Sequence, residues 1–198
     1  MIEIISQTIL ISSCRIHYLE AGNRKNKTVI LLHGMKFQAE TWKETGTLQH
    51  LADNGFHAIA VDMPGFGKSP TCELQPDAVL EHFIADSRNE VVLVGPSMGG
   101  RIALEFALTH PASLAGLVLV GAVGVKENSK RLPDIHIPTL IVWGSEDRIS
   151  PMTNFELLYK TIPGSEQVII AGAPHPCYLD NAEIWHRELV RFLNSKIK

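Results

Sequence analysis

The sequence contains no cluster of basic residues and carries little net charge. Its 18 Lys and Arg residues are scattered along the chain, and 21 Asp and Glu residues give a formal net charge of −3. Binding to the phosphate backbone of a nucleic acid requires a concentrated positive surface. We therefore expect no nucleic-acid partner.

Cysteine is also scarce, with Cys14, Cys72 and Cys177 as the three examples. Their number is odd, and no pair has the short spacing typical of metal ligands. We therefore expect no disulfide framework, a reducing compartment and no metal centre. The first five residues lack the basic start and cleavage site of a signal peptide, which favours a cytoplasmic location.

One long stretch, residues 106–125, has no charged residue and is long enough to suggest a membrane span. However, the polar segment 109–113 interrupts it and contains Pro111. The sequence therefore predicts the end of a helix, a turn and a buried strand at 115–120. We expect a soluble protein without a membrane partner.

The sequence does contain a regular alternation of short apolar runs and helix-like segments. The runs are continuous and rich in β-branched residues, which is typical of parallel strands covered on both faces. They lie at residues 29–32, 57–61, 91–94, 117–120, 140–143 and 168–170. Helical patterns occupy the spacers at residues 41–54, 97–109, 151–161 and 182–192. This alternation predicts an α/β fold, a doubly wound and mostly parallel sheet with helices on both faces.

The ends and connections of the chain complete this prediction. Residues 2–10 and 15–20 look like a hairpin that pairs at one edge of the sheet. No repeat or long linker divides the chain, so we expect a single domain over residues 1–198. The segment 121–137 is short and polar, with room for a loop and one small helix but not for a separate lid domain.

The most informative motif is Gly-Pro-Ser-Met-Gly at residues 95–99, between the strand at 91–94 and the next helix. A serine at the tip of a tight strand-to-helix turn is the nucleophile elbow of acyl-transfer enzymes. Side chains at Gly95 and Gly99 would collide with neighbouring elements. The motif predicts Ser97 as a catalytic nucleophile.

A serine hydroxyl is a weak nucleophile unless a histidine, oriented by a carboxylate, removes its proton. With this elbow the chain order is Ser, then Asp or Glu, then His. Glu146 and Asp147 both lie in the loop after the strand at 140–143, and we favour Asp147. Asp62, after the strand at 57–61, is an alternative acid.

The expected base is His175, which follows the strand at 168–170. His186 lies within a predicted helix, and the other seven histidines precede Asp147, against the expected order. Cys177 lies two residues after His175 but has no glycine turn of its own. We interpret Cys177 as a packing residue or pocket wall.

Together these motifs resemble the α/β-hydrolase superfamily over essentially the whole chain. A closer resemblance is to the small, lidless abhydrolase domain-containing 14 proteins. Residues 175–180 (His-Pro-Cys-Tyr-Leu-Asp) carry it most specifically, and residues 31–35 and 62–69 support it. The resemblance implies a compact cytosolic or nuclear hydrolase of short acyl esters, with acyl transfer to or from coenzyme A as a variant. It also suggests a protein partner.

Further residues have expected roles, given by the resemblance or by their place in the chain. The backbone N–H groups of Met35 and Met98 are the expected oxyanion donors. His33 is expected to be a structural hydrogen-bonding residue rather than a base. Candidate walls of the substrate pocket are His33, Phe37, Trp42 and Tyr178.

The expected function is therefore that of a serine esterase, with Ser97, Asp147 and His175 as its triad, a small acyl ester as substrate and no cofactor. One alternative keeps the triad but passes the acyl group to coenzyme A, whose phosphates would meet Arg101, Lys36 or Lys68. The other is a non-catalytic interaction module on a hydrolase fold.

Overall fold

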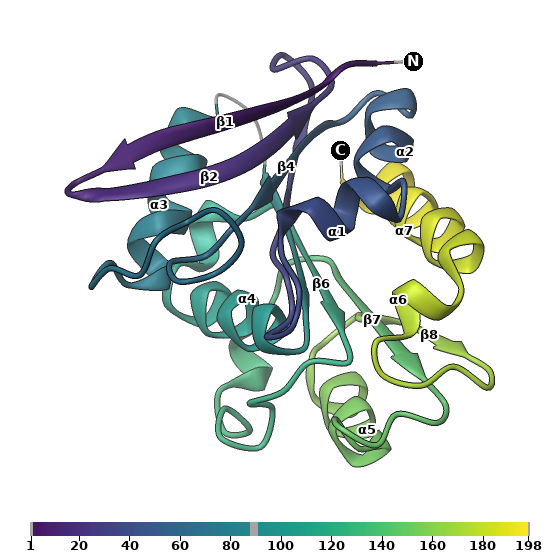
Figure 1. Ribbon diagram of the computed structural model, residues 1–198. Helices are drawn as coiled ribbons and strands as arrows, with labels where there is room; N and C mark the ends of the chain where they lie inside the picture. The colour runs from purple at the N-terminus through teal and green to yellow at the C-terminus, as the bar shows by residue number, and fades with distance from the viewer. Residues whose placement is uncertain (1, 88–90, 198) are drawn as a thin grey trace.

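The computed structural model describes residues 2–87 and 91–197 and is built around an eight-stranded sheet (Figure 1). The strand order is β1-β2-β4-β3-β5-β6-β7-β8, in which β3 to β8 are parallel and the β1–β2 hairpin is antiparallel at one edge. The mostly parallel sheet and the edge hairpin are confirmed. The strands are β1 (Ile4–Ile11), β2 (Cys14–Ala21), β3 (Thr28–Leu31), β4 (His57–Val61), β5 (Val91–Pro96), β6 (Gly116–Val120), β7 (Thr139–Gly144) and β8 (Glu166–Ile170).

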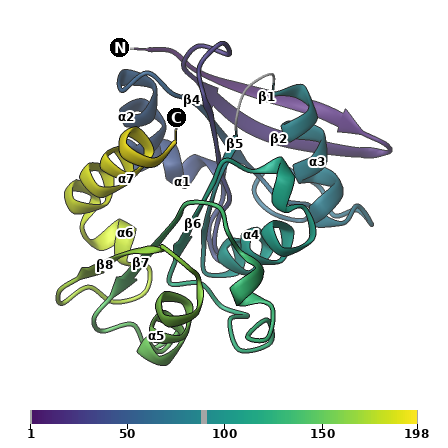
Figure 2. The same ribbon diagram turned by 180° about the vertical axis from the view of Figure 1, so that it is seen from behind.

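Helices cover both faces of the sheet, as Figures 1 and 2 show from opposite sides. One face packs against α1 (Ala39–Glu44), α2 (Thr47–Asp53), α6 (Cys177–Asp180) and α7 (Ala182–Lys196). The other packs against α3 (Pro76–Asp86), α4 (Met98–Thr109) and α5 (Met152–Thr161).

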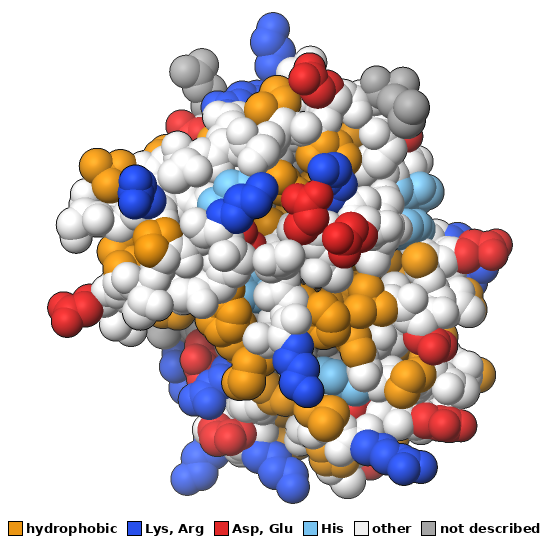
Figure 3. All heavy atoms as spheres, in the orientation of Figure 1, with side chains coloured by type: hydrophobic (Ala, Val, Ile, Leu, Met, Phe, Trp, Pro, Cys, Tyr) orange, Lys and Arg blue, Asp and Glu red, His pale blue; other side chains and the backbone are white. Residues whose placement is uncertain are grey.

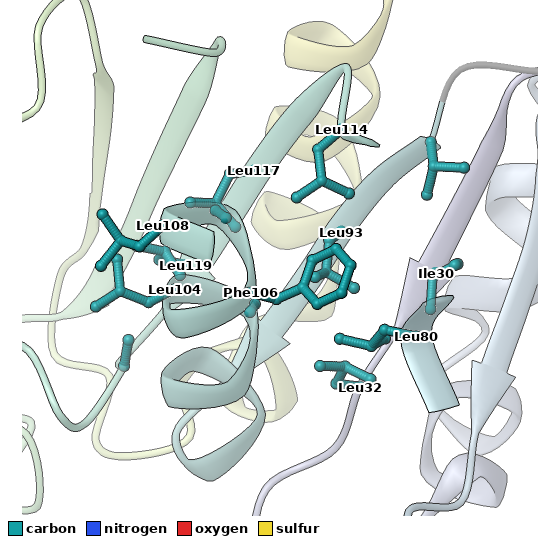
Figure 4. Close-up of a cluster of buried hydrophobic side chains, with 14 of the residues drawn as sticks. Ile30, Leu32, Leu80, Leu93, Leu104, Phe106, Leu108, Leu114, Leu117 and Leu119 are labelled. Carbon is teal, nitrogen blue, oxygen red and sulfur yellow. The ribbon is translucent and has the colours of Figure 1, made fainter. Parts of the chain in front are cut away.

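Alternate strand residues supply the two cores. On β3, Val29 and Leu31 pack in the first core, between the sheet and helices α1, α2, α6 and α7. Ile30, together with Leu32 after the strand, packs in the second core, between the sheet and helices α3, α4 and α5. This is the two-residue side-chain period of a strand buried on both faces. Figure 4 shows part of the second core, where Leu104, Phe106 and Leu108 of α4 lie against the sheet.

The helical prediction at residues 41–54 is wrong in one respect. Two helices occupy this stretch, because the first ends at Glu44 and Gly46 takes a left-handed conformation with φ 76°. Helix α3 was not predicted. Its start is marked by Pro76 at the first helical position, a common signal that is weak without a strong apolar stripe.

The uncharged stretch 106–125 folds as predicted. Helix α4 ends at Thr109, a 3₁₀ turn follows at Pro111–Ser113, and β6 begins at Gly116. Among residues 2–87 and 91–197, no helix is both long and apolar enough to cross a membrane. The segment 121–137 holds a loop and one 3₁₀ turn, Leu132–Asp134, so the prediction of no lid at this position is confirmed.

The expectation about cysteines is wrong for one pair, because Cys14 and Cys72 form a disulfide. Cys14 begins β2, and Cys72 lies in the loop after β4, 58 residues further along the chain. The fold brings their Cα atoms to 6.0 Å, a proximity that sequence spacing does not reveal. Cys177 is free and buried. The number of cysteines therefore gives no support for a reducing compartment.

A buried carboxylate, Glu20 on β2, lies among strong hydrogen-bond donors. His57 Nε2 is 2.6 Å from Glu20 Oε1, and Arg24 Nη2 donates to Oε2 at 2.7 Å. Burial raises the pKa of Glu20, but these hydrogen bonds and charges outweigh it and lower that pKa to about 2. Such a shift links the stability of the fold to pH.

We expect Glu20→Gln to lower the free energy of unfolding at pH 7 by about 2–3 kcal/mol. The pKa of Glu20 is lower in the folded protein than in the unfolded chain. The ionised carboxylate therefore stabilises the fold fully above about pH 4.5, and this contribution disappears as pH falls toward 2. Urea unfolding should therefore show that the difference in free energy of unfolding between wild type and Glu20→Gln is smaller at pH 3 than at pH 7. Glu3→Gln, an exposed control, should show no such change, and a constant gap for Glu20→Gln would contradict the prediction.

Candidate active site

Ser97 lies between β5 and α4 in a strained backbone conformation, with φ 51° and ψ −114°. The local sequence permits this turn. A Cβ added to Gly95 would overlap the backbone of Gly99, and one on Gly99 would lie 2.7 Å from the carbonyl oxygen of His33. Strain of this kind in a non-glycine residue is characteristic of functional sites. The side chain of Ser97 is thereby held at the end of the strand.

Segments that follow three neighbouring strands meet at Ser97. The backbone N–H of Ser97 donates to the carbonyl oxygen of Val120, the last residue of β6, at 2.9 Å. A Cβ on Gly34, in the turn after β3, would lie 3.6 Å from the Cβ of Ser97. These are the carboxyl ends of parallel strands, where ligands bind in open α/β sheets.

Asp147 and His175 form a close pair in the loops after β7 and β8. His175 Nδ1 lies 2.7 Å from Asp147 Oδ2, with 11% of the histidine side chain and 2% of the aspartate side chain exposed. The other carboxylate oxygen, Oδ1, accepts the backbone N–H groups of Ile149 and Ser150, each at 2.8 Å. These two donors were not predicted from the sequence, although Asp followed by a turn is their usual signal.

The two other acids weighed for this role lie elsewhere. The side chain of Glu146 is exposed. Asp62 is buried but bonds to His17 Nδ1 at 2.7 Å and to the backbone N–H of Ala39 at 2.6 Å. The structure therefore pairs His175 with Asp147.

The Asp147–His175 pair lies at the same sheet edge as the elbow. Gly121 follows Val120, the residue that accepts the Ser97 N–H. A Cβ on Gly121 would be 3.0 Å from both Asp147 Oδ2 and His175 Nδ1. A carboxylate can only accept from Nδ1–H, which leaves Nε2 of the imidazole as a proton acceptor.

His33 uses both ring nitrogens to hold the turn after β3. Its Nδ1 is 2.9 Å from the carbonyl oxygen of Gly34, and its Nε2 accepts the backbone N–H of Met63 at 3.1 Å. Burial lowers the pKa of His33, so the neutral ring is favoured. This geometry is that of a structural residue rather than of a base or a pocket wall.

The two amides expected as oxyanion donors lie in the turn after β3 and at the start of α4. Met98 begins α4, so its N–H belongs to the helical first turn, whose N–H groups have no intrahelical acceptor. Met35 follows Gly34 and has an exposed side chain. Their role as oxyanion donors remains a prediction.

The candidate pocket walls differ in exposure. Phe37 is half-buried and close to Gly34, which suits a position beside Ser97. Trp42 and Tyr178 are fully buried and stack with ring centroids 4.7 Å apart, and Trp42 Nε1 donates to the Leu32 carbonyl. Their burial favours packing over direct contact with substrate.

Cys177 is also buried, and burial raises the pKa of its thiol to about 12. The thiolate needed for nucleophilic attack is therefore scarce near neutral pH. Within residues 2–87 and 91–197, no group of three or more His, Cys, Asp or Glu side chains is placed to hold a metal ion.

The surface around the site is largely apolar, with a basic side chain among the hydrophobic ones. Figure 3 shows hydrophobic side chains gathered in the middle of one face, between α1 and α5, with histidine atoms among them. This region lies over the carboxyl ends of the parallel strands in the matching view of Figure 1. An apolar surface suits the uncharged part of an acyl substrate.

Comparisons with known proteins agree with this architecture. A family model described as serine aminopeptidase, S33, matches residues 23–130. "Putative protein-lysine deacylase ABHD14B" of Rattus norvegicus is 35% identical, over 98% of this chain and 98% of the relative. The Homo sapiens protein of the same name is 38% identical, over 89% of this chain and 88% of its own.

Among solved structures, a predicted CIB-like hydrolase from Thermoplasma acidophilum superposes with a TM-score of 0.88. It is 24% identical, and the match covers 98% of this chain and 99% of that one. At this identity the likeness is evidence for the fold alone.

Proposed function

Because the chain belongs to the ABHD14 group of the α/β-hydrolase superfamily, we propose that it is a serine esterase acting on short acyl esters. Serine hydrolase chemistry is the property of its family; the ester specificity and the roles of Ser97, Asp147 and His175 are our proposal. The observation that carries it is the 2.7 Å His175–Asp147 contact at the sheet edge that also holds the strained Ser97.

The proposed reaction has two steps. Ser97 Oγ attacks the acyl carbon while His175 Nε2 takes its proton, and Asp147 stabilises the resulting imidazolium through Nδ1–H. The N–H groups of Met35 and Met98 stabilise the oxyanion. The alcohol leaves with the proton held by His175, and water, activated in the same way, then releases the acid from the acyl-enzyme.

The substrate class follows from the segment 121–137. This connection holds only one 3₁₀ turn, so it supplies no lid to enclose a long acyl chain. An exposed acyl chain gains little from the burial that favours long-chain substrates. We therefore expect acetyl and butyryl esters to be better substrates than long-chain esters.

The direct test combines turnover with the location of the acyl group. The wild-type protein should hydrolyse p-nitrophenyl acetate and butyrate with a higher kcat/KM than p-nitrophenyl decanoate. Acid-quenched samples should carry the acetyl group on Ser97 when peptides are mapped by mass spectrometry. Turnover without any adduct at Ser97, or a preference for decanoate, would refute the proposal.

A second candidate substrate is the acyl-lysine of a protein, which the name of the relatives describes. The same triad can cleave an amide, with His175 giving its proton to the leaving amine. Acetyl-lysine peptides and p-nitrophenyl acetate, compared at equal concentration, separate the two candidates. Adding coenzyme A to either assay and looking for acetyl-coenzyme A tests transfer in place of hydrolysis.

A further inference from the structure

A second arrangement of serine, histidine and aspartate lies away from Ser97, at the hairpin edge of the sheet. Ser6 Oγ is 2.9 Å from His17 Nε2, and His17 Nδ1 is 2.7 Å from Asp62 Oδ2. The two ring nitrogens thus have the same kinds of partner as in a hydrolase triad: a hydroxyl at Nε2 and a carboxylate at Nδ1. The roles proposed above do not use any of the three.

Strand register explains how these residues meet. In the hairpin, Ser6 pairs with Leu19 and Thr8 pairs with His17, so Ser6 and His17 are diagonal neighbours on one face. Asp62 directly follows β4, and its backbone N–H donates to the carbonyl oxygen of His17 at 3.0 Å. Three residues distant in sequence are therefore held by backbone pairing.

The hydrogen bonds of Asp62 orient the ring of His17. Asp62 is buried and also accepts the backbone N–H groups of Ala39, at 2.6 Å, and Lys68, at 2.9 Å. Such donors stabilise the ionised carboxylate, which can only accept from His17 Nδ1–H. In the neutral ring, Nε2 then carries no hydrogen and can accept the proton of the Ser6 hydroxyl.

Solvent reaches the serine but not the groups that act on it. Ser6 is exposed. In contrast, only 4% of the His17 side chain and 2% of the Asp62 side chain are exposed to solvent. A cavity of about 250 Å³ opens here, with Leu19, Lys43 and Lys68 also in its lining. Figure 3 shows basic and acidic side chains over the hairpin and α1, with histidine atoms between them.

The cavity indicates which molecules fit. Its volume is below that of ordinary drug-sized pockets, so it suits a small acyl compound. Lys43 is paired with Glu40 at 2.8 Å, while Lys68 is an exposed cation at the cavity wall. Glu40 and Asp62 also line the cavity, but each is already bonded within the protein, which leaves Lys68 to attract a leaving group that carries negative charge.

We propose that Ser6 is a second acyl-accepting nucleophile, activated by His17 and Asp62, for small acyl donors with an anionic leaving group such as an acyl phosphate. Ser6 Oγ forms a bond to the acyl carbon, and its proton passes to His17 Nε2. The bond between the acyl carbon and the phosphate oxygen breaks, and phosphate leaves with the electron pair. His17 then loses its proton to the phosphate or to water.

The test removes Ser97 and leaves the rest of the protein intact. Full-length Ser97→Ala is treated with acetyl phosphate and its Cys14–Cys72 disulfide is then reduced. The peptide of residues 1–15, which ends at Arg15, is analysed by tandem mass spectrometry. Ser6 should be acetylated about 100-fold faster than Ser12 in the same peptide, since a positioned general base contributes at least about that factor. Equal acetylation of the two serines would overturn the proposal.

Two further variants test the role of His17 as the base and the role of Lys68 as the cation separately. Adding His17→Gln to Ser97→Ala should reduce acetylation of Ser6 to the level of Ser12, in protein whose urea unfolding midpoint shows that it folds. Adding Lys68→Ala should slow acetylation by acetyl phosphate more than by the uncharged p-nitrophenyl acetate. Unchanged acetylation of Ser6 in folded His17→Gln would overturn the role of His17 as the base. An equal effect of Lys68→Ala on both acyl donors would overturn the role of Lys68 toward the leaving group. Because Ser97 is absent throughout, these outcomes are independent of the proposed esterase function.

Discussion

Replacing Ser97 with alanine should lower kcat for p-nitrophenyl acetate by about 10⁴-fold or more, which corresponds to about 5 kcal/mol of lost transition-state stabilisation. The variant keeps the Cβ atom of residue 97 and loses only the hydroxyl, so the strained turn still forms. What it loses is the atom that bonds to the acyl carbon. Without an acyl-enzyme, His175 and Asp147 have no hydroxyl to activate. The measurement is steady-state release of p-nitrophenol.

Ser113→Ala is the matched control, because Ser113 is an exposed serine in the 3₁₀ turn after α4. It should retain the wild-type rate. Both variants should unfold at urea concentrations close to wild type, which excludes loss of structure as the cause. A Ser97→Ala protein that hydrolyses the ester at the wild-type rate would remove the basis of the proposed function. A small residual rate that disappears on adding Ser6→Ala would instead come from the hairpin site.

The order of motifs along the chain was sufficient to propose Ser97, Asp147 and His175. Each residue follows a separate apolar run, and in a parallel sheet the segments after the strands meet at one edge. The fold class was predictable for the same reason, because continuous apolar strands alternate with helices. The Gly-Pro-Ser-Met-Gly turn added a local signal, since glycines at 95 and 99 have close backbone neighbours.

Other features depend on contacts that no local pattern contains. The choice between Glu146 and Asp147 is decided by the direction of each side chain, exposed for one and toward His175 for the other. Trp42 and Tyr178 were candidate pocket walls by position, yet they stack inside the core.

The Cys14–Cys72 disulfide and the Ser6–His17–Asp62 cluster are long-range in the same way. Each joins the edge hairpin to the segment that follows β4. The pairing of β2 with β4 determines both, and it can be read only after the strand order is known.

The local hydrogen bonds of Asp147 lead to a sharp expectation for asparagine at this position. Oδ1 of Asp147 accepts two backbone N–H groups, from Ile149 and Ser150. An asparagine would keep its carbonyl oxygen there, because its NH₂ group would oppose two donors. Its NH₂ group would then take the place of Oδ2 and point at His175 Nδ1. The imidazole would have to accept at Nδ1 and carry its hydrogen on Nε2, where a proton acceptor for Ser97 is needed.

We therefore expect Asp147→Asn to lower kcat for p-nitrophenyl acetate by about 10⁴-fold near neutral pH, with the fold retained. Glu146→Gln is the matched control, since it neutralises the adjacent, exposed carboxylate and should leave kcat unchanged. Rates from p-nitrophenol release and unfolding midpoints in urea measure both effects. An equal decrease of kcat in Asp147→Asn and Glu146→Gln would indicate a general effect of negative charge near the site. A large loss in Asp147→Asn alone would show that catalysis requires the carboxylate that contacts His175.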